Sequence, residues 1–259
     1  MNILSRQFKS IVSIKFIIIW TLLIIGPIIF AVSRSNEYML FRPVDLFTLI
    51  LENILPMLFP LIVVCIFLLN FSNEKKDHFL FYTRSRIPIK TYLKQKFWLN
   101  NFSVFAIVFL FVFIPFVFCF YIEPSLGLVN YYPIESESDI SSHTFSQFLA
   151  YGSLVYGVVY SLWVALNGVL YAAIAFCLLI TINNSFLALS LPFIFYHIID
   201  FGIAILGFSK FSLTSTIFPF NIIQQPVWTV IVPFFFLVVI FFCLYAYIRK
   251  NFYKLDALL

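Results

Sequence analysis

The sequence predicts an all-α, polytopic membrane protein with six transmembrane helices and both termini in the cytoplasm. Of its 259 residues, 63% are hydrophobic and only 10% are charged, whereas a soluble domain has roughly 25% charged residues. Six stretches of the chain contain the ~20 mostly apolar residues that a helix needs to cross a bilayer. Lys and Arg are also unevenly distributed between the connecting segments, and this distribution predicts which segments face the cytoplasm.

The six predicted spans have polar or turn-forming residues at their ends. By residue number they are 13–32, 46–71, 97–122, 148–182, 186–207 and 227–248. The whole chain, 1–259, is expected to form a single transmembrane domain with extracellular loops 33–45, 123–147 and 208–226. Several prolines occur within the spans, and membrane helices tolerate proline better than soluble helices do. They are Pro27, Pro56, Pro60, Pro115, Pro192 and Pro233.

The segment 73–96, between the second and third spans, is the most basic part of the chain. It carries seven Lys or Arg residues against Glu74 and Asp77. With both termini inside, thirteen of the 16 Lys and Arg residues lie on the cytoplasmic side and three lie outside. Cytoplasmic loops of membrane proteins carry an excess of these residues. We therefore expect segment 73–96 and both termini to face the cytoplasm.

Two segments outside the spans are too apolar to lie free in water. The loop 208–226 is largely apolar and is interrupted by Pro219 and Pro226, so we expect it to re-enter the membrane or to pack as short helices on the bundle. The first thirteen residues mix Arg6 and Lys9 with apolar residues. That mixture predicts a short amphipathic helix at the cytoplasmic membrane surface.

The fourth span carries a stripe of small residues at helical spacing. Small residues let two helix backbones approach closely in a membrane. The stripe is predicted to be either a packing surface within the chain or a subunit interface or sliding surface, and both interpretations place this span at the centre. Its members are Ser153, Gly157, Ser161, Ala165, Gly168, Ala172 and Ala175.

Four of the polar residues within the predicted spans are candidates for a functional site. His197 and Asp200 are three residues apart, so they project from one helix face. An ionisable residue inside a membrane is by default a candidate functional residue. We retain three roles for the pair: an anchoring contact to a neighbouring helix or the following loop, a substrate contact, or proton coupling. Glu52 is either an interfacial carboxylate or a site residue, and Asn167 is a candidate for an interhelical hydrogen bond.

No motif in the sequence predicts catalysis, a metal site or a cofactor bound by this chain. Gly152 and Gly157 have the spacing of a phosphate-binding loop, but Val158 follows where that motif needs Lys. The Cys and His residues have no metal-ligand spacing. The basic residues lie at the ends of apolar stretches, which is typical of topology determinants and argues against nucleic-acid binding.

The loop between the second and third spans carries a resemblance to a known family. Glu74 follows the second span, the sequence Tyr82-Thr83-Arg84-Ser85-Arg86-Ile87-Pro88 comes next, and Lys96 leads into the third span. With the six spans and the surface helix, this pattern resembles the membrane subunit of bacterial type-2 ATP-binding-cassette (ABC) exporters. The resemblance implies that Glu74 opens a coupling helix that touches the ATPase. It further implies that Tyr82, Arg84 and Arg86 lie at or beside that contact and that Lys96 anchors the third span.

The resemblance also implies partners and a location. These are a dimer of cytoplasmic ABC ATPase subunits that binds ATP and Mg²⁺, a second permease chain, identical or related, and the lipid of a bacterial cell membrane. The aromatic spans favour a hydrophobic or amphipathic peptide as cargo, exported or expelled for self-protection. Two alternatives remain open at this point: an ion-coupled transporter or channel that uses Asp200 and His197, and a non-transporting membrane immunity protein.

Overall fold

The computed structural model describes residues 14–53, 55–77, 87–135 and 142–252. Throughout these ranges the regular elements are helices, and six of the helices are long and apolar enough to cross a membrane. The prediction of an all-helical chain with six helices able to cross a membrane is therefore confirmed for the described residues. The predicted surface helix 1–13 lies outside the described residues. The six long helices are α2 (Ile14–Ser33), α4 (Leu55–Lys76), α6 (Ile89–Val117), α8 (Ser153–Thr181), α9 (Ser185–Ile205) and α11 (Trp228–Lys250).

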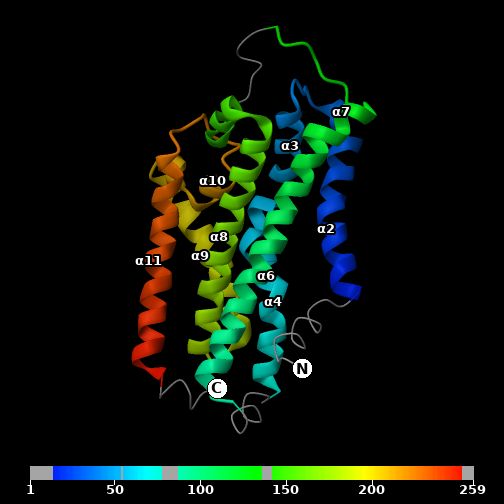
Figure 1. Ribbon diagram of the computed structural model, residues 1–259. Helices are drawn as coiled ribbons and strands as arrows, with labels where there is room; N and C mark the ends of the chain where they lie inside the picture. The colour runs from blue at the N-terminus through cyan, green and yellow to red at the C-terminus, as the bar shows by residue number, and fades with distance from the viewer. Residues whose placement is uncertain (1–13, 54, 78–86, 136–141, 253–259) are drawn as a thin grey trace.

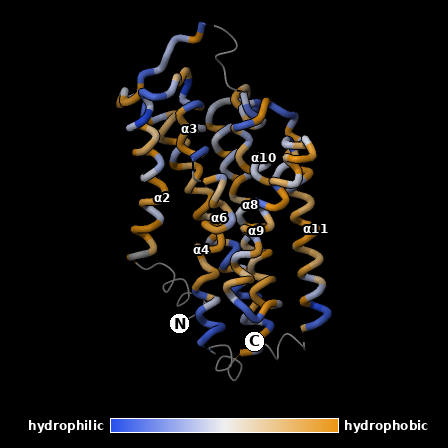
Figure 2. The backbone as a smooth tube through the Cα atoms, turned by 180° about the vertical axis from the view of Figure 1, so that it is seen from behind, coloured by the Kyte–Doolittle hydropathy of each residue, from blue (hydrophilic) through white to orange (hydrophobic). Residues whose placement is uncertain are grey.

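The long helices lie side by side, with α11 and α2 at opposite edges and α8 between them (Figure 1). Hydrophilic residues gather toward the two ends of the bundle and apolar residues fill its middle (Figure 2). We call one end the basic end, because α4 and α11 finish there and α6 begins there, with Lys75, Lys90 and Arg249 among the residues they bring. The other end is called the α10 end, after the short helix α10 (Leu213–Ile217).

The predicted second span, 46–71, is wrong at its start. The chain forms a separate ten-residue helix, α3 (Pro43–Glu52), and then begins α4 at Leu55. Proline disfavours the α conformation in the residue before it and cannot donate a backbone hydrogen bond. Pro56 therefore sits in the first turn of α4 and helps to separate α4 from α3, instead of lying within one continuous span.

The predicted loop 73–96 is shorter than expected, because helix continues into it from both sides. α4 runs on to Lys76, where two lysines complement the negative end of the helix dipole. α6 begins at Ile89, directly after Pro88. The third span is longer still, since a π-helix, η2 (Phe118–Ile122), and α7 (Glu123–Leu126) follow α6. Glu74 and Lys96 therefore lie on helices and not in the loop.

The fourth span also begins later than predicted. Residues 148–151 belong to a 3-10 helix, η4 (Thr144–Tyr151), and α8 begins at Ser153. Gly152 separates them with a φ of 113°, a value that favours glycine because other residues meet steric strain there. The fifth and sixth spans agree with the prediction to within two residues at each end.

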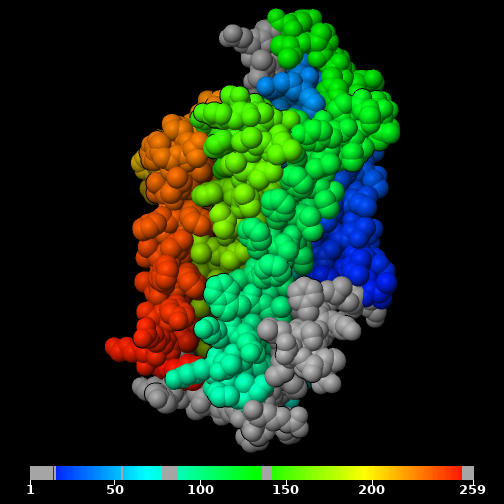
Figure 3. Space-filling model, in the orientation of Figure 1, coloured from blue at the N-terminus to red at the C-terminus, as the bar shows by residue number. Residues whose placement is uncertain are grey.

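α8 is the central helix, as the small-residue stripe predicted. About 72% of its span is buried inside the protein, against 11% for α2. α8 packs on α6, α4, α9 and α11, and Figure 3 shows α11, α8 and α6 together on one face. A Cβ added at Gly157 would overlap the ring of Phe116, and one added at Gly168 would press on Val108. Apart from Ser153, which is half-buried, the stripe residues are fully buried within this single chain. The stripe is thus a packing surface inside the chain.

Candidate functional site

The basic end holds an ion pair between the half-buried Glu74 and the buried Lys96, and this pair joins α4 to α6. The carboxylate of Glu74 accepts a hydrogen bond from Lys96 Nζ at 2.7 Å and another from the Tyr92 hydroxyl at 2.7 Å. The Lys96 side chain is only 3% exposed. We call Glu74, Tyr92 and Lys96 the α4–α6 clamp. A buried charge keeps its charged form only when it is paired and hydrogen-bonded, so this clamp fixes the two helices where they enter the loop.

The next residue, Lys75, joins the same turn of α4 to α8. Its Nζ donates to the carbonyl oxygens of Leu179, at 2.8 Å, and of Ile182, at 3.0 Å. The last carbonyls of a helix have no partner within the helix and carry its negative dipole. Lys75 is therefore a cation placed at the end of α8. Sequence reasoning missed this role, because the Lys75 ammonium and the Leu179 carbonyl are separated by 104 positions.

The structure describes only two of the five predicted ATPase-coupling residues, Glu74 and Lys96. Glu74 and Lys96, expected to open the coupling helix and to anchor the third span, are bonded to each other inside the bundle. Glu74 therefore differs from a residue that contacts a partner protein, because both of its carboxylate oxygens already have hydrogen-bond partners within the chain. Tyr82, Arg84 and Arg86 lie outside the described residues.

At the opposite end, α10 is held by side chains of two long helices. Near its C-terminus, the Thr216 carbonyl accepts from Trp163 Nε1 at 2.8 Å and the Ile217 carbonyl accepts from the Tyr160 hydroxyl at 3.0 Å. Near its N-terminus, the Thr214 amide donates to Asp200 Oδ1 at 3.1 Å. Segment 208–226 therefore packs on the bundle through short helices, as its apolar composition predicted.

His197 and Asp200 reach different partners. His197 Nε2 lies 3.0 Å from the carbonyl oxygen of Met57 in α4, and Asp200 contacts α10. Both partners are backbone groups of neighbouring segments. Of the three roles that the sequence left open, the geometry favours the anchoring contact, because each polar side chain fixes α9 to an adjacent element.

An Asp200→Ala substitution is expected to lower the free energy of unfolding by about 1 kcal/mol, the usual cost of losing an acceptor at a helix N-terminus. Asp200→Asn keeps an oxygen acceptor and should cost less than half as much. Denaturation of the purified chain in detergent measures both variants. Equal loss in the two variants would contradict the anchoring role and would show that the negative charge itself is required.

The remaining intramembrane candidates, Asn167 and Glu52, have contacts of two different kinds. The Asn167 side-chain amide donates to the Trp163 carbonyl, one turn earlier in α8, at 2.9 Å. The prediction of an interhelical hydrogen bond is therefore wrong for this nitrogen, because the carbonyl of the preceding turn lies within its reach. Glu52 lies at the end of α3, where its side chain forms a hydrogen bond with Asn221. None of the described His, Cys, Asp and Glu residues form a group that could hold a metal ion.

The α10 end contains buried polar residues that sequence reasoning did not single out. Glu123 is fully buried, and its carboxylate accepts from the Val129 amide at 3.0 Å and the Tyr131 hydroxyl at 2.8 Å. Burial and this carboxylate raise the pKa of Tyr131 well above its usual range. His143 is 3% exposed, and its Nε2 lies 3.1 Å from the Tyr156 hydroxyl. Glu123 was predicted only as the first residue of the extracellular loop 123–147, and no local pattern distinguishes it from Glu135 in the same loop.

The chain should become less stable as the pH is lowered below 6.5, because of His143. Burial, together with the Arg42 guanidinium, lowers the pKa of His143 from 6.5 to about 4. Between these pH values the unfolded chain binds a proton that the folded chain does not, so the free energy of unfolding should decrease by up to about 3 kcal/mol as pH falls from 6.5 to 4. Above pH 6.5 this contribution is constant.

Thermal denaturation in detergent at several pH values measures the effect. His143→Gln should flatten the dependence below pH 6.5, whereas the control His197→Gln should keep it, because His143 is unchanged there. A wild-type chain with the same pH dependence as His143→Gln would contradict the assignment.

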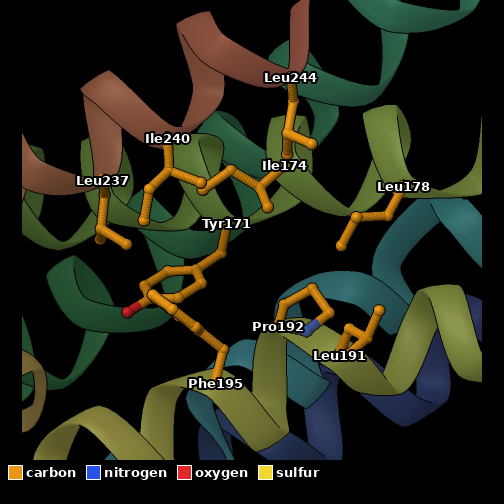
Figure 4. Close-up of a pocket in the computed structure, with 9 residues that line it drawn as sticks. All are labelled: Tyr171, Ile174, Leu178, Leu191, Pro192, Phe195, Leu237, Ile240 and Leu244. Atoms are coloured by element: carbon orange, nitrogen blue, oxygen red, sulfur yellow. The ribbon is translucent and has the colours of Figure 1, made fainter. Parts of the chain in front are cut away.

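Two hollows in the described part of the chain are apolar. One, of about 210 Å³, lies between α8, α9 and α11 and is lined by residues such as Ile174, Pro192 and Leu237 (Figure 4). The other, of about 690 Å³, lies between α2 and the α6–η2 segment, where Ile29 and Phe118 contribute to its walls. Almost all of their lining is apolar, so such surfaces suit lipid chains or apolar side chains better than a small polar solute.

Comparison with known proteins found no family model, no curated protein and no solved structure that matches this chain. The functional argument therefore depends on the geometry described above.

Proposed function

We propose that this chain is the membrane subunit of a bacterial ABC exporter of the type-2 class, driven by a separate ATPase subunit that binds ATP and Mg²⁺. In this proposal the chain has no catalytic role, the basic end faces the cytoplasm, and two permease chains, identical or related, form the transport path in the cell membrane. The cargo is a hydrophobic or amphipathic peptide, such as an antimicrobial or toxin peptide.

The observation that carries the proposal is the joined base of the loop between α4 and α6. Both helices continue to the loop, and Glu74 ties them together through Tyr92 and Lys96. A loop that transmits a force from a partner protein to these two helices must be rigid where it joins them. The α4–α6 clamp makes this junction rigid, and the loop beyond it is rich in Lys and Arg.

The α10 end supports the same proposal. An exporter of this class is expected to have short re-entrant helices between its last two spans, and the short helix α10, which packs on α8 in this segment, supports that expectation. The apolar hollows between helices are consistent with an apolar cargo. In contrast, His197 and Asp200 contact backbone groups, so no observation here favours an ion-coupled transporter.

The proposal is tested by purifying the tagged chain from its native host in a mild detergent and identifying the proteins that accompany it by mass spectrometry. An ATPase subunit in near-equal amount is the expected result. Arg84→Glu with Arg86→Glu should remove it. The control Arg249→Glu reverses a charge that is exposed at the same end, and it should retain the ATPase. A folded chain that purifies without any ATPase would refute the proposal.

A further inference from the structure

The last turn of α4 holds two helices by two adjacent residues. Glu74 is bonded to α6, and Lys75 is bonded to the end of α8. The next residues, Lys76 and Asp77, are exposed. Lys75 therefore adds a hydrogen-bonded connection between the last turn of α4 and α8, beside the apolar packing of these helices.

α8 in turn makes the hydrogen bonds that hold the far end of α10. Tyr160 and Trp163 donate to the α10 carbonyl groups from the same helix whose last carbonyls accept from Lys75. Tyr160 and Leu179 are 19 residues apart in one uninterrupted helix, which is about 28 Å along the helix axis. The helix is buried for most of that length, so it cannot bend freely.

We propose that α8 acts as a rod that connects the two ends of the molecule, and that Lys75 is the positioning residue that attaches this rod to the last turn of α4. A displacement at the basic end then moves α8 and, through Trp163 and Tyr160, moves α10. The physical connection is independent of any partner, but its use in transport rests on the proposed function: the ATPase would open or close the α10 end by this route.

Hydrogen exchange of the purified full-length chain tests the connection without an ATPase. The amides of Thr216 and Phe218 are hydrogen-bonded within α10 and report its stability. Lys75→Met removes the ammonium and keeps most of the length of the side chain. We expect it to raise amide exchange in α10 about threefold or more, the size of effect that mutations between coupled sites produce. Lys75→Arg should largely restore the wild-type rate, and Lys76→Met, a matched change at an exposed neighbour, should have no effect.

A purely local role for Lys75 gives a different result. If Lys75→Met raised exchange only near residues 179–185 and left α10 unchanged, the inference would be wrong. Coupling between two sites is reciprocal, so Trp163→Phe should raise exchange at the basic end of α4. This second variant decides the question even if Lys75→Met does not fold, because unchanged exchange there would also overturn the inference.

Failure of the proposed function is a separate observation. The same Lys75→Met chain can be purified from the native host to ask whether an ATPase accompanies it. Because Lys75 is turned toward α8, the amount of ATPase bound should match the wild type. Absence of the ATPase from the wild type and from every variant would refute the exporter proposal. The hydrogen-exchange result would still test whether α8 connects the two ends of the molecule.

Discussion

Gly157→Ala is expected to destabilise the chain by about 3 kcal/mol, at the upper end of what overpacking usually costs. A Cβ at this position would overlap the ring of Phe116. That ring cannot move away easily, because it is fully buried and packs on Phe47 and Tyr156. Denaturation of the purified chain in detergent micelles measures the loss.

The matched control is Gly202→Ala in α9. A Cβ at Gly202 has nothing within 4 Å, and alanine is favoured over glycine in a helix by roughly 0.5–1 kcal/mol. The two substitutions are chemically identical, but their surroundings differ. Gly157→Ala should therefore lower the stability of the chain, and Gly202→Ala should raise it. Combining Gly157→Ala with Phe116→Leu should recover part of the loss. A Gly157→Ala chain as stable as Gly202→Ala would show that α6 and α8 are not in close contact at Phe116.

Glu74→Gln is expected to cost about 3 kcal/mol, because removing the partner of the buried Lys96 leaves its charge uncompensated. Lys96 would keep its ammonium in a site that is 3% exposed. The control is Glu37→Gln, which breaks the exposed pair of Glu37 with Arg34 and should cost at most about 0.5 kcal/mol. Denaturation in detergent compares the two losses directly.

A second substitution separates the buried charge from other effects. Lys96→Met in the Glu74→Gln background removes the unpaired ammonium, so it should restore part of the lost stability. No restoration would mean that Lys96 is not the cause. The same reasoning limits how charge reversal can be used: Glu74→Lys would disturb the bundle itself, so a resulting loss of transport would not identify Glu74 as an ATPase contact.

The six spans could be predicted because the signal is local. A stretch of about 20 apolar residues is visible in the sequence whatever it packs against, and the small residues of α8 mark the central helix for the same reason. The predicted span boundaries are wrong where a single proline or glycine interrupts the helix within an apolar stretch. Pro56 and Gly152 are both visible in the sequence, but a prediction based on hydropathy ignores the backbone conformations that they impose.

The contacts of the candidate site could not be predicted, because they join residues that are distant in sequence. Lys75 looks like any lysine at the end of a membrane helix, and only the fold brings it to the last carbonyls of α8. Asp200 was found because an acid in a span is rare, yet its partner on α10 was not evident. Glu123 begins the predicted loop 123–147, and nothing in the sequence indicates that the fold buries it.

The π-helix η2 determines which way the chain faces after the third span. A π-helical turn holds one more residue than an α-helical turn, so it rotates everything that follows by about 100° relative to a regular α-helix. Glu123 comes directly after this segment and faces Val129 and Tyr131. Deleting one residue between Phe118 and Ile122 would let the segment relax to an α-helix and would turn the carboxylate out of its buried position. The length of this stretch, as well as its composition, is therefore part of what places a charged residue inside the protein.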